Sequence, residues 1–116
     1  MTEQYSEGSE AALIPRPAET PAALRRAVAR ILPSRLKEFD GQLLEASTEA
    51  QELMDIGPLR VFCYRWSRVI EIERYPVTAR RLAELEHIVG TGHPDTGSAV
   101  KETSRILRDA DAALGR

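Results

Sequence analysis

The chain of 116 residues has one cysteine, two histidines and few aromatic residues, and it contains no long apolar run. Because Cys63 is alone, it cannot form an internal disulfide, and its place on an apolar helical face indicates a buried thiol. No stretch reaches the ~18 apolar residues of a membrane span. No apolar segment follows a basic start, as it would in a secretory signal. We therefore expect a cytoplasmic protein with no membrane partner.

Residues that commonly carry chemistry are also too scattered to form a site. His87 and His93 lack the ligand spacing of a zinc site. The glycines between residues 90 and 97 follow no strand and precede no lysine, so they do not form a phosphate loop. Carboxylates two positions apart point away from each other on a helix. We expect no catalytic residue, no cofactor and no metal, and hence a non-enzymatic protein.

Charge is balanced overall but unevenly distributed. The formal net charge is -2, so no global field attracts nucleic acid or membrane. Residues 1–58 hold 6 basic and 10 acidic side chains, whereas residues 59–116 hold 10 and 8. The acidic excess therefore lies in the first half of the chain.

Apolar residues recur at helical spacing in five segments. Proline or a Thr-Pro pair marks most of their starts and ends. The segments are residues 21–32, 34–56, 57–75, 76–89 and 98–114, with Ser34 expected to cap the second and Gly57-Pro58 to separate it from the third. Short connections favour antiparallel neighbours. The sequence predicts an all-α fold, a small antiparallel bundle of four to five helices.

The central segment should hold the core. It contains the only tryptophan, Trp66, and apolar residues that recur at helical spacing. We predict that the bundle packs around Trp66 and Phe39. Residues 1–19 are polar and broken by prolines, so we expect a flexible tail before a single helical domain at 20–116.

The last segment, residues 98–116, follows a glycine-rich loop and has a narrow apolar stripe. A helix of this length is marginal alone in water, so it must dock on its own core or on another chain. We predict that this segment either forms a homodimer, by exchange of the helix between two copies, or docks on a partner protein. The side chains expected to make that contact are Ile106, Leu107 and Leu114.

Several of these signals resemble a family of small actinobacterial proteins known only as a domain of unknown function. The similarity covers roughly residues 20 to 90, and the proline-bounded helix with its tryptophan is the most specific element. The segment 90–116 departs from the pattern. The matching residues are Pro21-Ala-Ala-Leu-Arg-Arg, Leu32-Pro33, Glu38-Phe39-Asp40, Leu44-Glu45-Ala46 to Glu49-Ala50, Asp55-Ile-Gly-Pro-Leu59, Trp66-Ser-Arg68 and Arg74-Tyr-Pro76 to Arg80-Arg-Leu82.

The resemblance implies an all-helical accessory protein, in some members similar to antitoxin partners of neighbouring toxins. It brings no catalytic residue. Together with the acidic second helix, it favours a protein-binding module that masks or regulates a partner such as a toxin. On that helix the expected contact residues are Glu45, Glu49 and Glu52.

Two arginine clusters keep other interpretations open. A salt-bridged solvated face, a protein-binding surface and nucleic-acid binding all fit arginines among aromatic and acidic residues. DNA binding is the alternative function and is not favoured. Its candidate residues are Arg25, Arg26, Arg30, Arg35 and Lys37.

Overall fold

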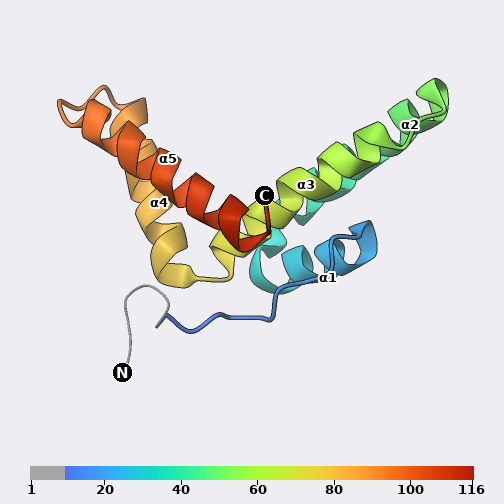
Figure 1. Ribbon diagram of the computed structural model, residues 1–116, viewed down its shortest axis with the longest axis horizontal. Helices are drawn as coiled ribbons and strands as arrows, with labels where there is room; N and C mark the ends of the chain where they lie inside the picture. The colour runs from blue at the N-terminus through green and yellow to red at the C-terminus, as the bar shows by residue number, and fades with distance from the viewer. Residues whose placement is uncertain (1–9) are drawn as a thin grey trace. The chain divides into compact units, whose positions relative to one another are not determined.

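Five α-helices dominate the computed structural model, which describes residues 10–116 (Figure 1). The helices are α1 (Pro21–Ile31), α2 (Leu36–Leu53), α3 (Gly57–Glu73), α4 (Pro76–Gly90) and α5 (Thr96–Ala113), and a 3-10 helix, η2 (Pro33–Arg35), precedes α2. No strand occurs between residues 10 and 116. The predicted all-α fold is confirmed.

Local sequence explains the starts of α1 and α4. Thr20 caps α1, because its Oγ1 accepts a hydrogen bond from the Ala23 N–H at 3.2 Å, and Pro21 opens the first turn. Proline likewise opens α4. The predicted cap at Ser34 is wrong. The chain there forms η2, and α2 begins after Arg35 without a side-chain cap. The start of α5 at Thr96 lies inside the predicted loop.

The described chain groups into two compact units, where the sequence predicts one domain at 20–116. The first, here called the hairpin unit, is Ile14–Ile70. The second, the C-terminal unit, contains Glu71–Arg116 together with residues 10–13. The boundary falls near the end of α3. Each unit has its own buried side chains and is described by itself.

Three aromatic rings form the centre of the hairpin unit. Phe39 is fully buried and Trp66 is 2% exposed. The Phe39 ring meets the Phe62 ring at 4.9 Å and the Trp66 ring at 5.0 Å between centroids, both edge to face. Because Phe39 belongs to α2 and the other two rings to α3, the cluster holds these helices together. The predicted burial of Phe39 and Trp66 is confirmed.

Helix α1 covers one side of this cluster. Its Leu24, Ala27 and Val28 are buried against it, at the spacing that the sequence shows. Arg25 on the exposed side of α1 binds Asp40 of α2 through two hydrogen bonds of 2.8 Å. This pair fixes α1 along the first half of α2. With 11 residues against 18, α1 is much shorter than α2.

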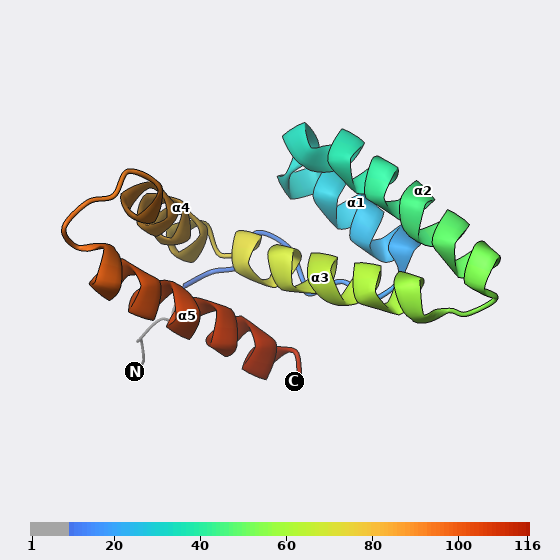
Figure 2. The same cartoon turned by 90° about the horizontal axis from the view of Figure 1, so that it is seen from above.

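In the C-terminal unit, α4 and α5 lie side by side (Figures 1 and 2). Leu85 of α4 and Ala99 and Ala110 of α5 are buried. Arg81 of α4 binds the Glu102 carboxylate with both fork nitrogens, at 2.7 and 2.8 Å. This hydrogen bonding holds the pKa of Glu102 below its ordinary value. Thus α5 docks on its own chain.

The predicted tail is described only from Glu10 onward, since residues 1–9 lie outside the described residues. The Glu10 carboxylate accepts hydrogen bonds from the Val77 N–H at 2.6 Å and from Thr78 Oγ1 at 3.1 Å. The Leu13 N–H donates to the Arg74 carbonyl at 2.7 Å. Glu10 therefore supplies the N-terminal cap that α4 lacks from its own sequence.

We predict that Trp66→Ala destabilises the protein by about 3–5 kcal/mol, because it removes a buried ring from the aromatic cluster and leaves a cavity. Chemical denaturation followed by circular dichroism measures the loss. A loss below about 1 kcal/mol would contradict the central place of this ring in the hairpin unit.

Deleting residues 96–116 should unfold α4 while the hairpin unit stays folded. The deletion removes α5, which packs against α4 and buries its Ala99 and Ala110, and an isolated helix as short as α4 is marginal in water. We expect helicity to fall by more than α5 alone accounts for, with the fluorescence of Trp66 unchanged. A fall equal to the deleted helix, with no further loss, would show that α4 needs no support from α5.

Candidate functional site

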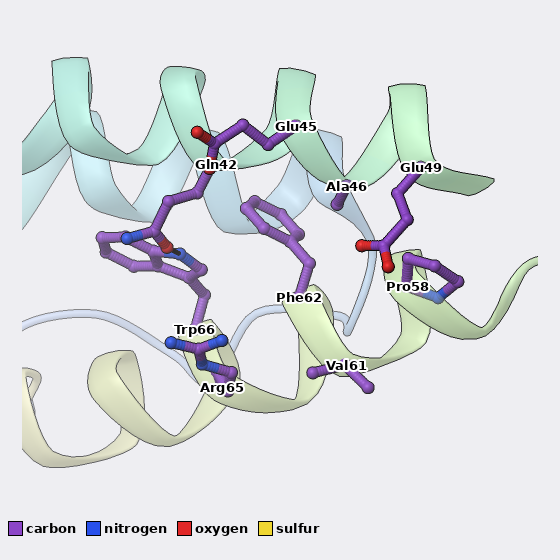
Figure 3. A pocket seen from close by; sticks show the side chains of 9 residues that line it. All are labelled: Gln42, Glu45, Ala46, Glu49, Pro58, Val61, Phe62, Arg65 and Trp66. Atoms are coloured by element: carbon purple, nitrogen blue, oxygen red, sulfur yellow. Dashed lines mark hydrogen bonds between the residues drawn. The ribbon is translucent and has the colours of Figure 1, made fainter. Parts of the chain in front are cut away.

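A groove of about 480 Å³ runs between α2 and α3 on the hairpin unit (Figure 3). Its lining alternates in steps of three and four on both helices, so each helix presents one face to it. The groove has apolar walls and polar edges. The lining residues are Gln42, Glu45, Ala46 and Glu49 of α2, and Pro58, Val61, Phe62, Arg65 and Trp66 of α3.

The floor of the groove is the inner side of the aromatic cluster. Figure 3 shows Phe62 and Trp66 rising from α3 toward α2. The Trp66 Nε1–H donates a hydrogen bond to Gln42 Oε1 at 2.9 Å, which fixes the indole edge. Because the ring is both buried and hydrogen-bonded, the floor is rigid and preformed.

An arginine stacks on the same indole. The Arg35 guanidinium lies 4.8 Å from the Trp66 ring centroid and binds both Glu38 carboxylate oxygens, at 2.9 and 3.0 Å. The hydrogen bond from Arg35 is the main cause that lowers the pKa of Glu38, against a smaller effect of desolvation. Glu38 thereby holds Arg35 in place against the ring.

The rim of the groove carries unpaired charge. Glu45 and Glu49 are exposed one helical turn apart, and neither forms an ion pair with any residue between 10 and 116. Figure 3 shows the Glu49 side chain hanging toward Pro58 across the groove. The α2 edge of the groove is therefore anionic and suits a cationic side chain next to an apolar one, whereas the α3 edge carries the exposed Arg65.

The structure brings two of the three predicted acidic residues to one site. Glu45 and Glu49 line the groove, whereas Glu52 is exposed nearer the end of α2 and does not line it. On α5, Ile106 and Leu107 are half-buried, and Leu114 is half-buried just after the helix ends. Since α5 packs on α4, part of the apolar stripe of α5 is buried by contacts within the same chain. The homodimer stays a prediction.

The residues of the nucleic-acid alternative divide into two groups. Arg25 is bound to Asp40, and Arg35 is bound to Glu38 and stacked on the indole. Arg26, Arg30 and Lys37 are exposed and form no ion pair with a described residue. Because two of the five charges are matched by neighbouring carboxylates, the net positive field at this surface is smaller than the sequence suggests.

Sequence reasoning missed the second wall of the groove. Pro58, Val61 and Arg65 of α3 follow the same steps of three and four as the acidic face of α2. The sequence shows this spacing, but it does not show which helix faces this side of α3. Cys63 is half-buried beside this wall, and burial, with a smaller effect from Glu19, raises the pKa of its thiol.

The described part of the chain contains neither a metal-binding cluster nor a membrane-spanning helix. No three His, Cys, Asp or Glu side chains within residues 10–116 gather in a way that could hold a metal ion. None of the helices there is long and apolar enough to cross a membrane.

Residues 13–111 match the protein family described as "Family of unknown function (DUF6247)". The match spans most of the chain, and the protein therefore belongs to this family. It reaches nearly to the end of α5, so the expectation that segment 90–116 departs from the family pattern is wrong. No curated protein and no solved structure matches the chain.

The Glu38 carboxylate should make the Trp66 environment depend on pH. Its pKa lies below the ordinary value of 4.5, so the Arg35–Glu38 pair is intact above that pH and is lost as the pH falls through the lowered pKa. We expect an acid step in Trp66 fluorescence. Glu38→Gln should show altered emission already at neutral pH and a smaller acid step.

Glu86→Gln is the matched control, because Glu86 is an exposed carboxylate on α4, outside the hairpin unit. Glu86→Gln should show the same acid step in Trp66 fluorescence as the wild type. Equal steps in the wild type and in Glu38→Gln would show that Glu38 does not hold Arg35 against the indole.

Proposed function

We propose that this protein is a non-enzymatic protein-binding module whose groove between α2 and α3 takes a basic amphipathic helix of a partner protein. The observation that carries the proposal is the pair of unpaired carboxylates, Glu45 and Glu49, above the rigid floor of Phe62 and Trp66. A helix laid in a groove presents its apolar stripe to the floor and its flanking charges to the rim.

The geometry of the groove supports a helix as the occupant. Both walls are themselves helical faces, so a third helix would pack its side chains between theirs as in a three-helix bundle. The aromatic floor offers an apolar surface to an anchor side chain, the kind of contact that dominates binding energy. The two rim carboxylates would meet lysine or arginine one turn apart on the partner.

Charge argues against a second copy of this chain on the α2 edge of the groove and the end of the hairpin. The end of the hairpin, residues 44–56, carries four acidic residues and no basic one. Two such surfaces repel each other, whereas a basic partner is attracted. The resemblance to actinobacterial accessory proteins favours an antitoxin-like role, in which the groove masks a basic surface of a toxin and regulates it.

Reversing the rim charge tests the proposal. The double variant Glu45→Lys/Glu49→Lys should weaken binding to the partner by roughly 10- to 100-fold, because two attractive contacts become repulsive. The protein encoded by the neighbouring gene is the first partner to co-express and titrate by calorimetry. Since both side chains are exposed, the fold and its helicity should be unchanged.

Glu86→Lys on α4 serves as the control for a change of net charge, and it should bind as the wild type does. A complex that tolerates both rim reversals with unchanged affinity would refute the groove as the binding site.

A further inference from the structure

The turn that joins α2 to α3, here called the apex, places apolar side chains in solvent. Met54 is 93% exposed, and its neighbours Leu53 and Ile56 are 60% and 56% exposed. The apex also borders a second groove, of about 380 Å³, that is distinct from the one described above. This apex groove is lined by Ser47, Ala50, Gln51, Met54, Asp55, Ile56 and Leu59.

Met54 also has a backbone conformation that methionine rarely adopts. Its φ is 52° and its ψ is 46°, and it is the single non-glycine residue with positive φ among residues 10–116. The Asp55 N–H donates to the Ala50 carbonyl at 3.0 Å, and the Met54 N–H donates to the Gln51 carbonyl at 3.3 Å. These two bonds define a Schellman motif, in which the Met54 position is usually glycine.

Neither property of Met54 benefits the fold. A side chain with positive φ destabilises the native state, and a side chain that is almost fully exposed gains nothing from packing. Glycine would relieve the strain, yet an apolar side chain is present instead. Strain of this kind, together with clustered exposed apolar residues, is characteristic of binding surfaces.

Nothing within the hairpin unit covers the apex groove. The lining on α2 follows the steps Ser47, Ala50 and Met54, so it lies on a different face of α2 from Glu45 and Glu49. The short α1 reaches only the first half of α2, where Arg25 binds Asp40. The apex groove is therefore an open helix-packing surface between two helices.

We propose that the apex groove takes a second amphipathic segment of the same partner, anchored by Met54 and Ile56, so that the partner holds the hairpin from two sides. That both segments belong to one partner rests on the proposed function above. The segment should be basic, because Glu52 and Asp55 flank the apex and the nearest cationic side chain in the sequence is Arg60, in the first turn of α3.

The probe is a displayed library of 16-residue helical peptides with a fixed leucine stripe and random flanks, selected on the full-length protein. Peptides for the apex groove should be enriched in lysine and arginine. Their affinity should fall roughly tenfold or more in Met54→Gly and Met54→Asn, which remove the anchor. Met54→Leu keeps an apolar side chain of similar size and should bind within about threefold of the wild type.

The stability of the Met54→Gly variant shows whether Met54 acts as a binding anchor or as a structural residue. Met54→Gly should raise the midpoint of chemical denaturation, because glycine accepts positive φ without strain, while it weakens apex binders. Peptides for the α2–α3 groove should respond to Glu45→Lys/Glu49→Lys and not to Met54→Gly. They test the proposed function independently.

The proposal is overturned if no selected peptide loses affinity in Met54→Gly, whatever the rim variants do. Binders sensitive to Met54 that lack basic residues would overturn the assigned chemistry of the segment. Loss of all binders by the rim reversal, with none sensitive to Met54, would leave the α2–α3 groove standing and remove the apex.

Discussion

The contact between Phe39 of α2 and the Phe62 and Trp66 rings of α3 is the interaction on which the hairpin unit depends. The rings lie edge to face at about 5 Å, so they set both the distance and the rotation of the two helices. Helix α1 buries its apolar stripe against the same cluster. Phe62 and Trp66 also line the candidate groove. Stability and binding geometry therefore share one set of side chains, and substitutions there change both.

Electrostatics divides the hairpin unit into two parts. Near α1 the carboxylates of α2 are matched within the chain, since Asp40 binds Arg25 and Glu38 binds Arg35. Farther along α2, Glu45 and Glu49 have no partner among the described residues. Exposed pairs of this kind add little stability, but they leave little net charge to attract a ligand. The unmatched carboxylates are therefore the part of the acidic surface of α2 that can select a partner by charge.

Local sequence predicted much of this fold. Periodic apolar residues identified the stripe of α1 and the burial of Phe39 and Trp66, and prolines marked the starts of α1 and α4. The unpredicted features depend on residues far apart in sequence or on unusual residues at standard positions. The groove wall needed the pairing of α2 with α3. The positive φ of Met54 could not be predicted, because a methionine after a helix does not indicate that conformation. Gly57, which the sequence suggested as the separator of the two helices, opens α3 instead, and its N–H donates to Asp55. The amino-acid composition of the chain also did not indicate the boundary between the two units.

The cap on α4 has a consequence for the order of folding. The acceptor, Glu10, lies 67 positions before the Val77 N–H that it binds. A contact of such sequence separation requires closure of a long loop, which costs chain entropy before it contributes any stability. During synthesis Glu10 leaves the ribosome long before α4 exists. The first turn of α4 is therefore completed late, by a residue that is among the first of the described chain to be made.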